Sequence, residues 1–344
     1  MGMVRKGLFF LLIILVGAVI YFWSLIAYGV GQGWGQLKVV YQARPVAEFL
    51  DNPAFPDSLK RKLRLIDEIR HYAIDSLGLR DTDNYKTLYD QHGQEIMWVV
   101  TACEPFRLQP RQWKFPVVGT IPYKGYFNKD KAVAEAELLK QEGWDVAIRN
   151  PGGWSTLGWF TDPILSGMLN RSDGDLASLI MHEMVHATLW VPDSVDFNEN
   201  LASFIADTAS YDFLKWKYGA SSQEYMQYLY EDQDYRKFSR HILLASRKLD
   251  SLYGTMNESQ AIEVKKKGKE EMIRKIVKNM DTLKLHLNPT PSKRYEKRLP
   301  NTTYFMAYRH YQAKQTEFAK EFNNHFKGDV RAYVSFLTEK YGVD

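Results

Sequence analysis

The chain has 344 residues and nearly balanced charge, with 45 basic and 41 acidic side chains and a formal net charge of +4 at pH 7. This balance argues against a nucleic-acid-binding protein, which needs a strongly basic face. With 45% apolar and 14% aromatic residues, the chain is long enough to bury a large core of one or two subdomains. Cys103 is its single cysteine, so no intrachain disulfide forms, and a buried structural role is expected for the thiol.

The first feature in chain order is an uncharged, largely apolar run of 21 residues from Leu8 to Tyr28. A helix of that length can cross a hydrocarbon core of roughly 30 Å. Arg5 and Lys6 precede the run, and basic residues favour the cytoplasmic side. The sequence therefore predicts a cytoplasmic segment at 1–7, a transmembrane anchor at 8–28, and a domain at 29–344 outside the inner membrane. The alternative is a cleaved signal peptide, but its apolar region is usually shorter and ends at a small-residue cleavage site.

The remaining pattern predicts an α+β fold. Residues 36–77 are expected to be helical, with turns at Arg44-Pro45 and Asn52-Pro53. Runs rich in β-branched and aromatic residues predict short strands at 96–101, 115–118, 144–148 and 155–159, with a helix at 129–142 between the second and third. From Asp175 onward the pattern is helical almost throughout. We expect a small antiparallel or mixed sheet within 29–170, followed by a largely helical half at 171–344.

The motif HEMVH at residues 182–186 carries the clearest chemical signal. His182 and His186 are four residues apart, so on a helix both imidazoles lie on one face and reach one metal ion. Catalytic zinc sites take three protein ligands and leave a fourth position for water. Glu199, thirteen residues after His186, offers the third ligand at the start of a second periodic helix over 197–218. The structural alternative is a core helix with two hydrogen-bonded histidines.

HEMVH followed by NENLASF at 198–204 resembles the glutamate-zincin branch of the zinc peptidases, and more narrowly a bacterial family of aminopeptidases. The segments at 113–119, 122–127 and 155–163 also resemble the narrower family. The resemblance implies that His182, His186 and Glu199 bind one zinc ion and that Glu183 is the general base. The chemistry agrees, because zinc acidifies its bound water and polarises a carbonyl while a nearby carboxylate moves the proton.

One position departs from the wider branch. Many of those relatives carry an Asp four residues after the ligand Glu, where it orients a ligand histidine, but this chain has Ser203. A histidine ligand needs a partner at its other ring nitrogen. That partner is Ser203 itself, Asp207 or a backbone carbonyl.

Other candidates concern the substrate. By similarity to zincins, an edge strand at 155–159 pairs with an extended peptide, although Trp154 and Trp159 there also suit packing against helices. Tyr304 and Tyr311 are candidate donors to the developing oxyanion, with core packing as the alternative. Glu104 and Asp162, near the ends of predicted strands, are candidate partners for the free α-ammonium of an aminopeptidase substrate. Asp162-Pro163 is also an ordinary turn start, and a structural role is favoured for both residues.

The sequence thus predicts a membrane-anchored zinc metallopeptidase, an aminopeptidase by resemblance, that acts on a peptide or protein outside the cytoplasm. Three alternatives stay open: an endopeptidase, a cell-wall amide hydrolase that uses the same zinc site, and a non-catalytic peptide-binding scaffold.

Overall fold

The structure is a computed structural model. It describes residues 5, 6, 8–10, 13, 17, 20–116, 119–151, 161–192, 194–311 and 315–341. Within these ranges the chain is mostly helical with small sheets, so the expected class, α+β with an N-terminal transmembrane helix, is corrected. The expected strand at 155–159 and part of the one at 115–118 lie outside the described residues.

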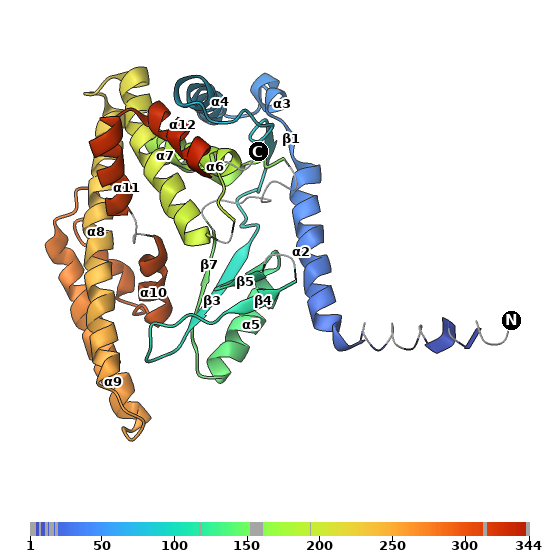
Figure 1. Ribbon diagram of the computed structural model, residues 1–344, viewed down its shortest axis with the longest axis vertical. Helices are drawn as coiled ribbons and strands as arrows, with labels where there is room; N and C mark the ends of the chain where they lie inside the picture. The colour runs from blue at the N-terminus through green and yellow to red at the C-terminus, as the bar shows by residue number, and fades with distance from the viewer. Residues whose placement is uncertain are drawn as a thin grey trace.

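The N-terminal half alternates helices with short strands (Figure 1). Strand β3 is central to an antiparallel sheet of order β6-β3-β7, and β2 pairs antiparallel with β1 and parallel with β8. Strands β4 and β5 form a separate antiparallel pair. The elements are α2 (Trp23–Gln42), β1 (Arg44–Pro45), α3 (Val46–Asp51), α4 (Asp57–Leu77), β2 (Thr87–Tyr89), β3 (Trp98–Cys103), β4 (Trp113–Phe115), β5 (Gly119–Ile121), β6 (Lys124–Tyr126), α5 (Lys129–Gln141), β7 (Asp145–Arg149) and β8 (Ile164–Leu165).

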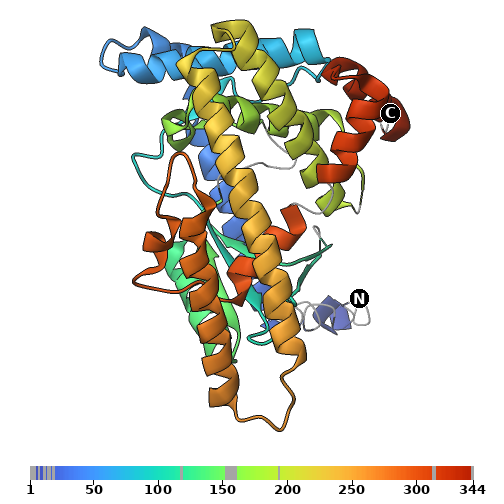
Figure 2. The same ribbon diagram turned by 90° about the vertical axis from the view of Figure 1, so that its left-hand side faces the viewer.

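The C-terminal half is helical. Helices α8 and α9 run side by side as a long pair along one flank of the molecule (Figure 2). Short 3-10 helices flank this half and connect its helices, at Ser166–Asn170, Met280–Leu283 and Pro291–Tyr295, and a π-helical turn spans Phe322–Phe326. The α-helices are α6 (Asp173–Thr188), α7 (Val195–Tyr218), α8 (Gln223–Gly254), α9 (Ile262–Asn279), α10 (Thr302–Tyr311), α11 (Gln315–Glu321) and α12 (Val330–Tyr341).

The expected membrane anchor is not borne out. No helix among the described residues is both long enough and apolar enough to cross a membrane. This finding corrects the predicted transmembrane helix at 8–28, part of which lies outside the described residues, and the single-pass inner-membrane location. The physical reason is the composition of α2, which begins at Trp23, inside the apolar run, and extends beyond it. Its residues 29–36 include four glycines and two glutamines, so the mean hydropathy of the helix is low.

Helix α2 packs against the protein's own sheet. The Tyr28 hydroxyl and the Gln32 amide both donate hydrogen bonds to the Gly125 carbonyl in β6, at 2.9 and 3.0 Å. The Phe127 ring sits against the backbone of Gly35, where a Cβ atom would be 2.2 Å from a ring carbon. The glycine is therefore needed for close approach of helix and loop.

Helices α6 and α7 pack on each other and on α4 around the largest apolar cluster of the described chain. Buried residues Leu176, Ile180 and Met184 recur every four positions along α6, so one side of this helix faces the core. Ser172 caps its N-terminus by accepting a hydrogen bond from the Asp175 N–H at 3.1 Å. This packing fixes the direction in which the opposite side of α6 presents its polar residues.

We predict that Gly35→Ala destabilises the protein by about 1–3 kcal/mol, because the added methyl overlaps the Phe127 ring and forces the ring or helix to move. The matched control is Gly33→Ala in the same helix, where a Cβ meets no described atom within 4 Å. Alanine's better helix propensity should stabilise that variant by about 0.5–1 kcal/mol. Thermal unfolding measures both, and a Gly35→Ala protein as stable as the Gly33→Ala protein would contradict the docking of α2.

Candidate metal centre

Three side chains predicted to share a site come together between α6 and α7. The Nε2 atoms of His182 and His186 are 3.0 Å apart on one face of α6. The two carboxylate oxygens of Glu199, in the second turn of α7, lie 3.4 Å from Nε2 of His182 and 3.5 Å from Nε2 of His186. Their potential ligand atoms all lie within 4.8 Å of one another. The arrangement can accept a single ion between two helices.

The spacing of these atoms fits a tetrahedral zinc site. Ligand atoms about 2.0–2.1 Å from zinc are separated by about 3.3 Å along the edges of a tetrahedron. The two Nε2 atoms are 3.0 Å apart, and each lies 3.4 or 3.5 Å from one of the two Glu199 oxygens, so these separations bracket that value. The side chains are 15–29% exposed, which leaves one side open to a water molecule or a substrate. Two imidazoles and one carboxylate are also a donor set that zinc prefers.

The electrostatics of the three groups are coupled. Burial lowers the pKa of His182, but its hydrogen bond to Glu199 and the charges of Glu183 and Glu199 together raise that pKa above its usual value. Burial raises the pKa of Glu199, yet hydrogen bonds and charges from both histidines outweigh it and hold the pKa well below the usual range. Protons on the imidazoles therefore compete directly with a metal ion, and binding of an ion must release them.

Glu183 lies beside this cluster on α6. Burial raises the pKa of its carboxyl group, the two histidines oppose that shift, and the charges of Glu199 and Asp162 add to it. A carboxylate with a raised pKa binds a proton more readily than an exposed carboxylate does. A general base at this site would need a carboxylate in such a position.

Ser203 is the nearest described partner of the second His182 nitrogen. Its Oγ lies 3.4 Å from Nδ1 of His182, one turn of α7 after Glu199. Asp207, one turn further on, accepts hydrogen bonds from Ser178 at 2.8 Å and Tyr228 at 3.3 Å. Of the alternatives considered from the sequence, the structure therefore places Ser203 against the ring, with Asp207 behind it.

Sequence reasoning missed Asn198, which connects the two helices. Its side-chain oxygen accepts from the Val191 N–H at 2.9 Å, and its side-chain nitrogen donates to the Val191 carbonyl at 2.8 Å. These two bonds tie the turn after α6 to the first turn of α7, directly beside Glu199. The sequence signal was the Asn that begins NENLASF, but neither its burial nor its partner Val191 could be predicted from the sequence.

The structure does not place either candidate tyrosine at the metal cluster. Tyr304 lies in a separate apolar cluster among α8, α9 and α10, where its ring packs on Tyr295 and Tyr308 at 5.7 and 5.5 Å between centroids. Burial raises its pKa strongly. Tyr311 ends α10, and its side chain lies outside what the structure describes.

Of the two candidate partners for a substrate ammonium group, Asp162 lies near Glu183 and Glu104 lies beside Cys103. Asp162 is buried and close enough to Glu183 for its charge to raise the pKa of that carboxyl group. Glu104 instead lies beside Cys103, where its charge adds to the burial that raises the pKa of the thiol to about 12. Cys103 is fully buried, as expected, and a thiol with that pKa is a poor nucleophile at neutral pH.

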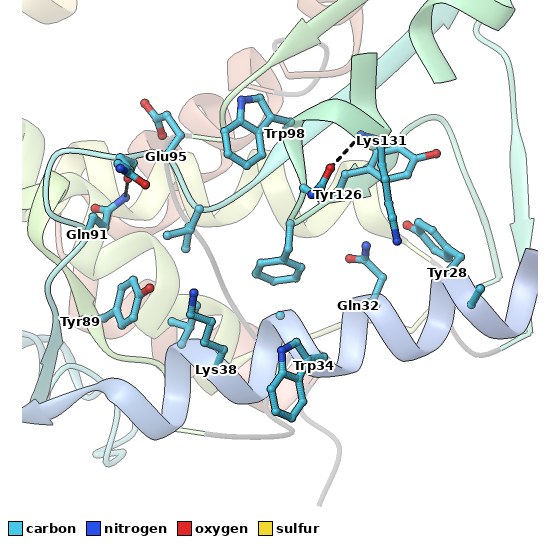
Figure 3. A pocket seen from close by; sticks show the side chains of 18 residues that line it. Tyr28, Gln32, Trp34, Lys38, Tyr89, Gln91, Glu95, Trp98, Tyr126 and Lys131 are labelled. Carbon is cyan, nitrogen blue, oxygen red and sulfur yellow. Dashed lines mark hydrogen bonds between the residues drawn. The ribbon is translucent and has the colours of Figure 1, made fainter. Parts of the chain in front are cut away.

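A cavity of about 450 Å³ lies apart from this centre, between α2 and the loops around β2, β3 and β6. Figure 3 shows aromatic and amide side chains around it, among them Trp34, Trp98 and Gln32. None of the three clustered residues lines this cavity. Its position follows from the docking of α2 rather than from the metal centre.

Comparison with known families decides the class of protein. A family model described as "Putative aminopeptidase" matches residues 27–340, from the first turns of α2 to the end of α12. The chain belongs to this family. No curated protein and no solved structure gives a significant match. Membership of the aminopeptidase family supports a peptidase function, and the matched range contains the whole described cluster.

We predict that Ser203→Ala weakens zinc binding by about 10- to 100-fold, because the His182 ring loses its nearest partner. Ser210→Ala is the matched control, since that buried hydroxyl on the same helix donates to the Ala206 carbonyl at 2.7 Å. Its zinc affinity should equal that of the wild type. Competition with a chromophoric chelator measures each affinity, and equal affinities for the two variants would exclude the role given to Ser203.

Proposed function

We propose that the protein is a zinc-dependent aminopeptidase of the glutamate-zincin type, with one zinc ion held by His182, His186 and Glu199. The observation that carries the proposal is the cluster of these three side chains, with 3.0 Å between the two Nε2 atoms and 3.4 and 3.5 Å from each of them to one of the two Glu199 oxygens. The cluster has three such residues, whereas a structural zinc site is normally closed by four protein ligands, and this supports a hydrolytic site. The half-buried Glu183 beside it supports the same proposal, because a carboxylate there could move a proton.

The roles of the residues follow from their chemistry. Zinc in this position would supply an acidified water and a polarised scissile carbonyl. Glu183 takes the proton of the attacking water at its carboxylate and returns it to the leaving amine. Ser203 holds the His182 ring in the orientation that keeps Nε2 directed at the site. The substrate is a peptide or protein.

A neighbouring carboxylate makes cleavage at a free N-terminus chemically reasonable. Asp162 is buried beside Glu183, so negative charge is concentrated on that side of the site. The α-ammonium of a substrate is a cation that such charge attracts. An acetylated N-terminus lacks this charge.

We predict that Glu183→Gln lowers kcat/KM for peptides with a free N-terminus by about 10²–10⁴-fold, because the isosteric amide cannot accept the proton. Its zinc content should stay at one ion per chain, since Glu183 is not a ligand. Glu271→Gln makes the same chemical change on the exposed face of α9 and should leave kcat/KM unchanged.

Peptide hydrolysis and metal analysis of the same samples provide the measurement. Full activity of Glu183→Gln with zinc bound would overturn its assignment as the base. Equal cleavage of free and acetylated peptides would replace the aminopeptidase with an endopeptidase.

A further inference from the structure

Tyr85 is a buried side chain with an unsatisfied hydroxyl. It lies in the turn just before β2, is only 4% exposed, and belongs to the apolar cluster that supports α6. No described residue offers its hydroxyl a hydrogen bond. A buried tyrosine hydroxyl usually has a partner, so an unsatisfied one next to a candidate site needs an explanation.

The backbone of Tyr85 adds a second unusual feature. Its φ angle is +65°, in the left-handed region that bulky side chains rarely adopt. Two hydrogen bonds hold it there: the Tyr85 N–H donates to the Asp162 carbonyl at 2.8 Å, and the Asp162 N–H donates to the Asn84 side chain at 2.9 Å. Strained conformations that the surroundings impose are concentrated at functional sites.

Tyr85 shares its apolar cluster with Met184, the residue that follows the proposed general base Glu183 on α6. Burial raises the pKa of Tyr85 well above its usual value, and the carboxylates of Glu183 and then Asp162 raise it further. The hydroxyl therefore stays protonated, so it can act as a hydrogen-bond donor or contribute only to packing. Glu183 acts on it more strongly than Asp162, whose N–H and carbonyl already hold the turn containing Tyr85.

We propose that Tyr85 is a positioning residue for Glu183, whose carboxylate receives a hydrogen bond from the Tyr85 hydroxyl in the working site. The inference rests on the proposed function. Hydrogen bonds of catalytic groups are often long or misaligned before substrate binds and tighten in the complex. Such a bond would keep the carboxylate directed at the attacking water, and it explains why a tyrosine with a positive φ angle and a buried hydroxyl without a described partner is held at this position.

Tyr85→Phe tests the proposal, with Tyr295→Phe as a matched control. Tyr295 is also a buried tyrosine, 9% exposed, but it lies in the separate cluster of α8, α9 and α10, where its ring packs on Tyr304. Both substitutions remove one buried hydroxyl and keep the ring, so both variants should stay folded, with a Tm within about 4 °C of the wild-type value. Only Tyr85→Phe should reduce kcat, by about 10- to 100-fold, the value of a hydrogen bond to a charged group. Its KM and zinc content should stay unchanged.

A double-mutant cycle adds a readout that does not need activity. In metal-free protein, the change in Tm caused by Tyr85→Phe should differ by about 2 °C between the wild-type and Glu183→Gln backgrounds, because the two side chains interact. Equal changes, or a kcat for Tyr85→Phe that matches Tyr295→Phe, would overturn the role of Tyr85 alone. A wild-type protein that binds zinc but cleaves no peptide would overturn both this role and the proposed function.

Discussion

The candidate metal centre depends on the packing of α6 against α7, because this contact sets the separations of the potential ligand atoms. His182 and His186 come from one helix, so their spacing is local, but Glu199 reaches them only if α7 folds back at the correct distance and rotation. The paired hydrogen bonds between Asn198 and Val191 fix that return at the turn. On the other side of α6, the backbone of Gly174 touches the ring of Tyr228 in α8, where a Cβ would be only 2.5 Å from a ring carbon. A shift of about 1 Å in either contact would move Glu199 away from the two imidazoles, and binding sites require tighter positioning than that.

The charges around the triangle favour a cation there. The groups that raise the pKa of His182 are all carboxylates, namely Glu199, Glu183 and Asp207. Burial disfavours the charged forms of Glu183 and Asp207, whose pKa values are both raised. Several buried carboxylates close together are unfavourable unless a proton or a cation compensates them. A divalent ion between the imidazoles and Glu199 would provide that compensation, so the surroundings and the ligand atoms lead to the same conclusion.

The parts of the site that sequence could predict are those in which local spacing decides the geometry. Two histidines four residues apart must share a helix face, and the periodicity after Pro192 located the second helix close to its observed bounds at Val195–Tyr218.

The prediction failed where contacts between residues distant in sequence determine the structure. The uncharged run at 8–28 satisfied a length criterion for a membrane helix. That criterion takes no account of tertiary contacts, and Tyr28 and Gly35 contact residues almost a hundred positions later. Tyr304 suited an oxyanion donor by residue type, and the packing of α10 placed it among other tyrosines instead. Tyr85 had no signal at all, since neither its φ angle nor its buried hydroxyl is visible in a sequence.

The most direct test of the central claim is zinc K-edge X-ray absorption on the purified protein loaded with one equivalent of zinc. The account predicts that the ion is retained in a shell of about four nitrogen and oxygen ligands at about 2.0–2.1 Å, with outer-shell scattering from two imidazole rings. A protein that does not retain zinc, or a spectrum without imidazole scattering, would contradict it.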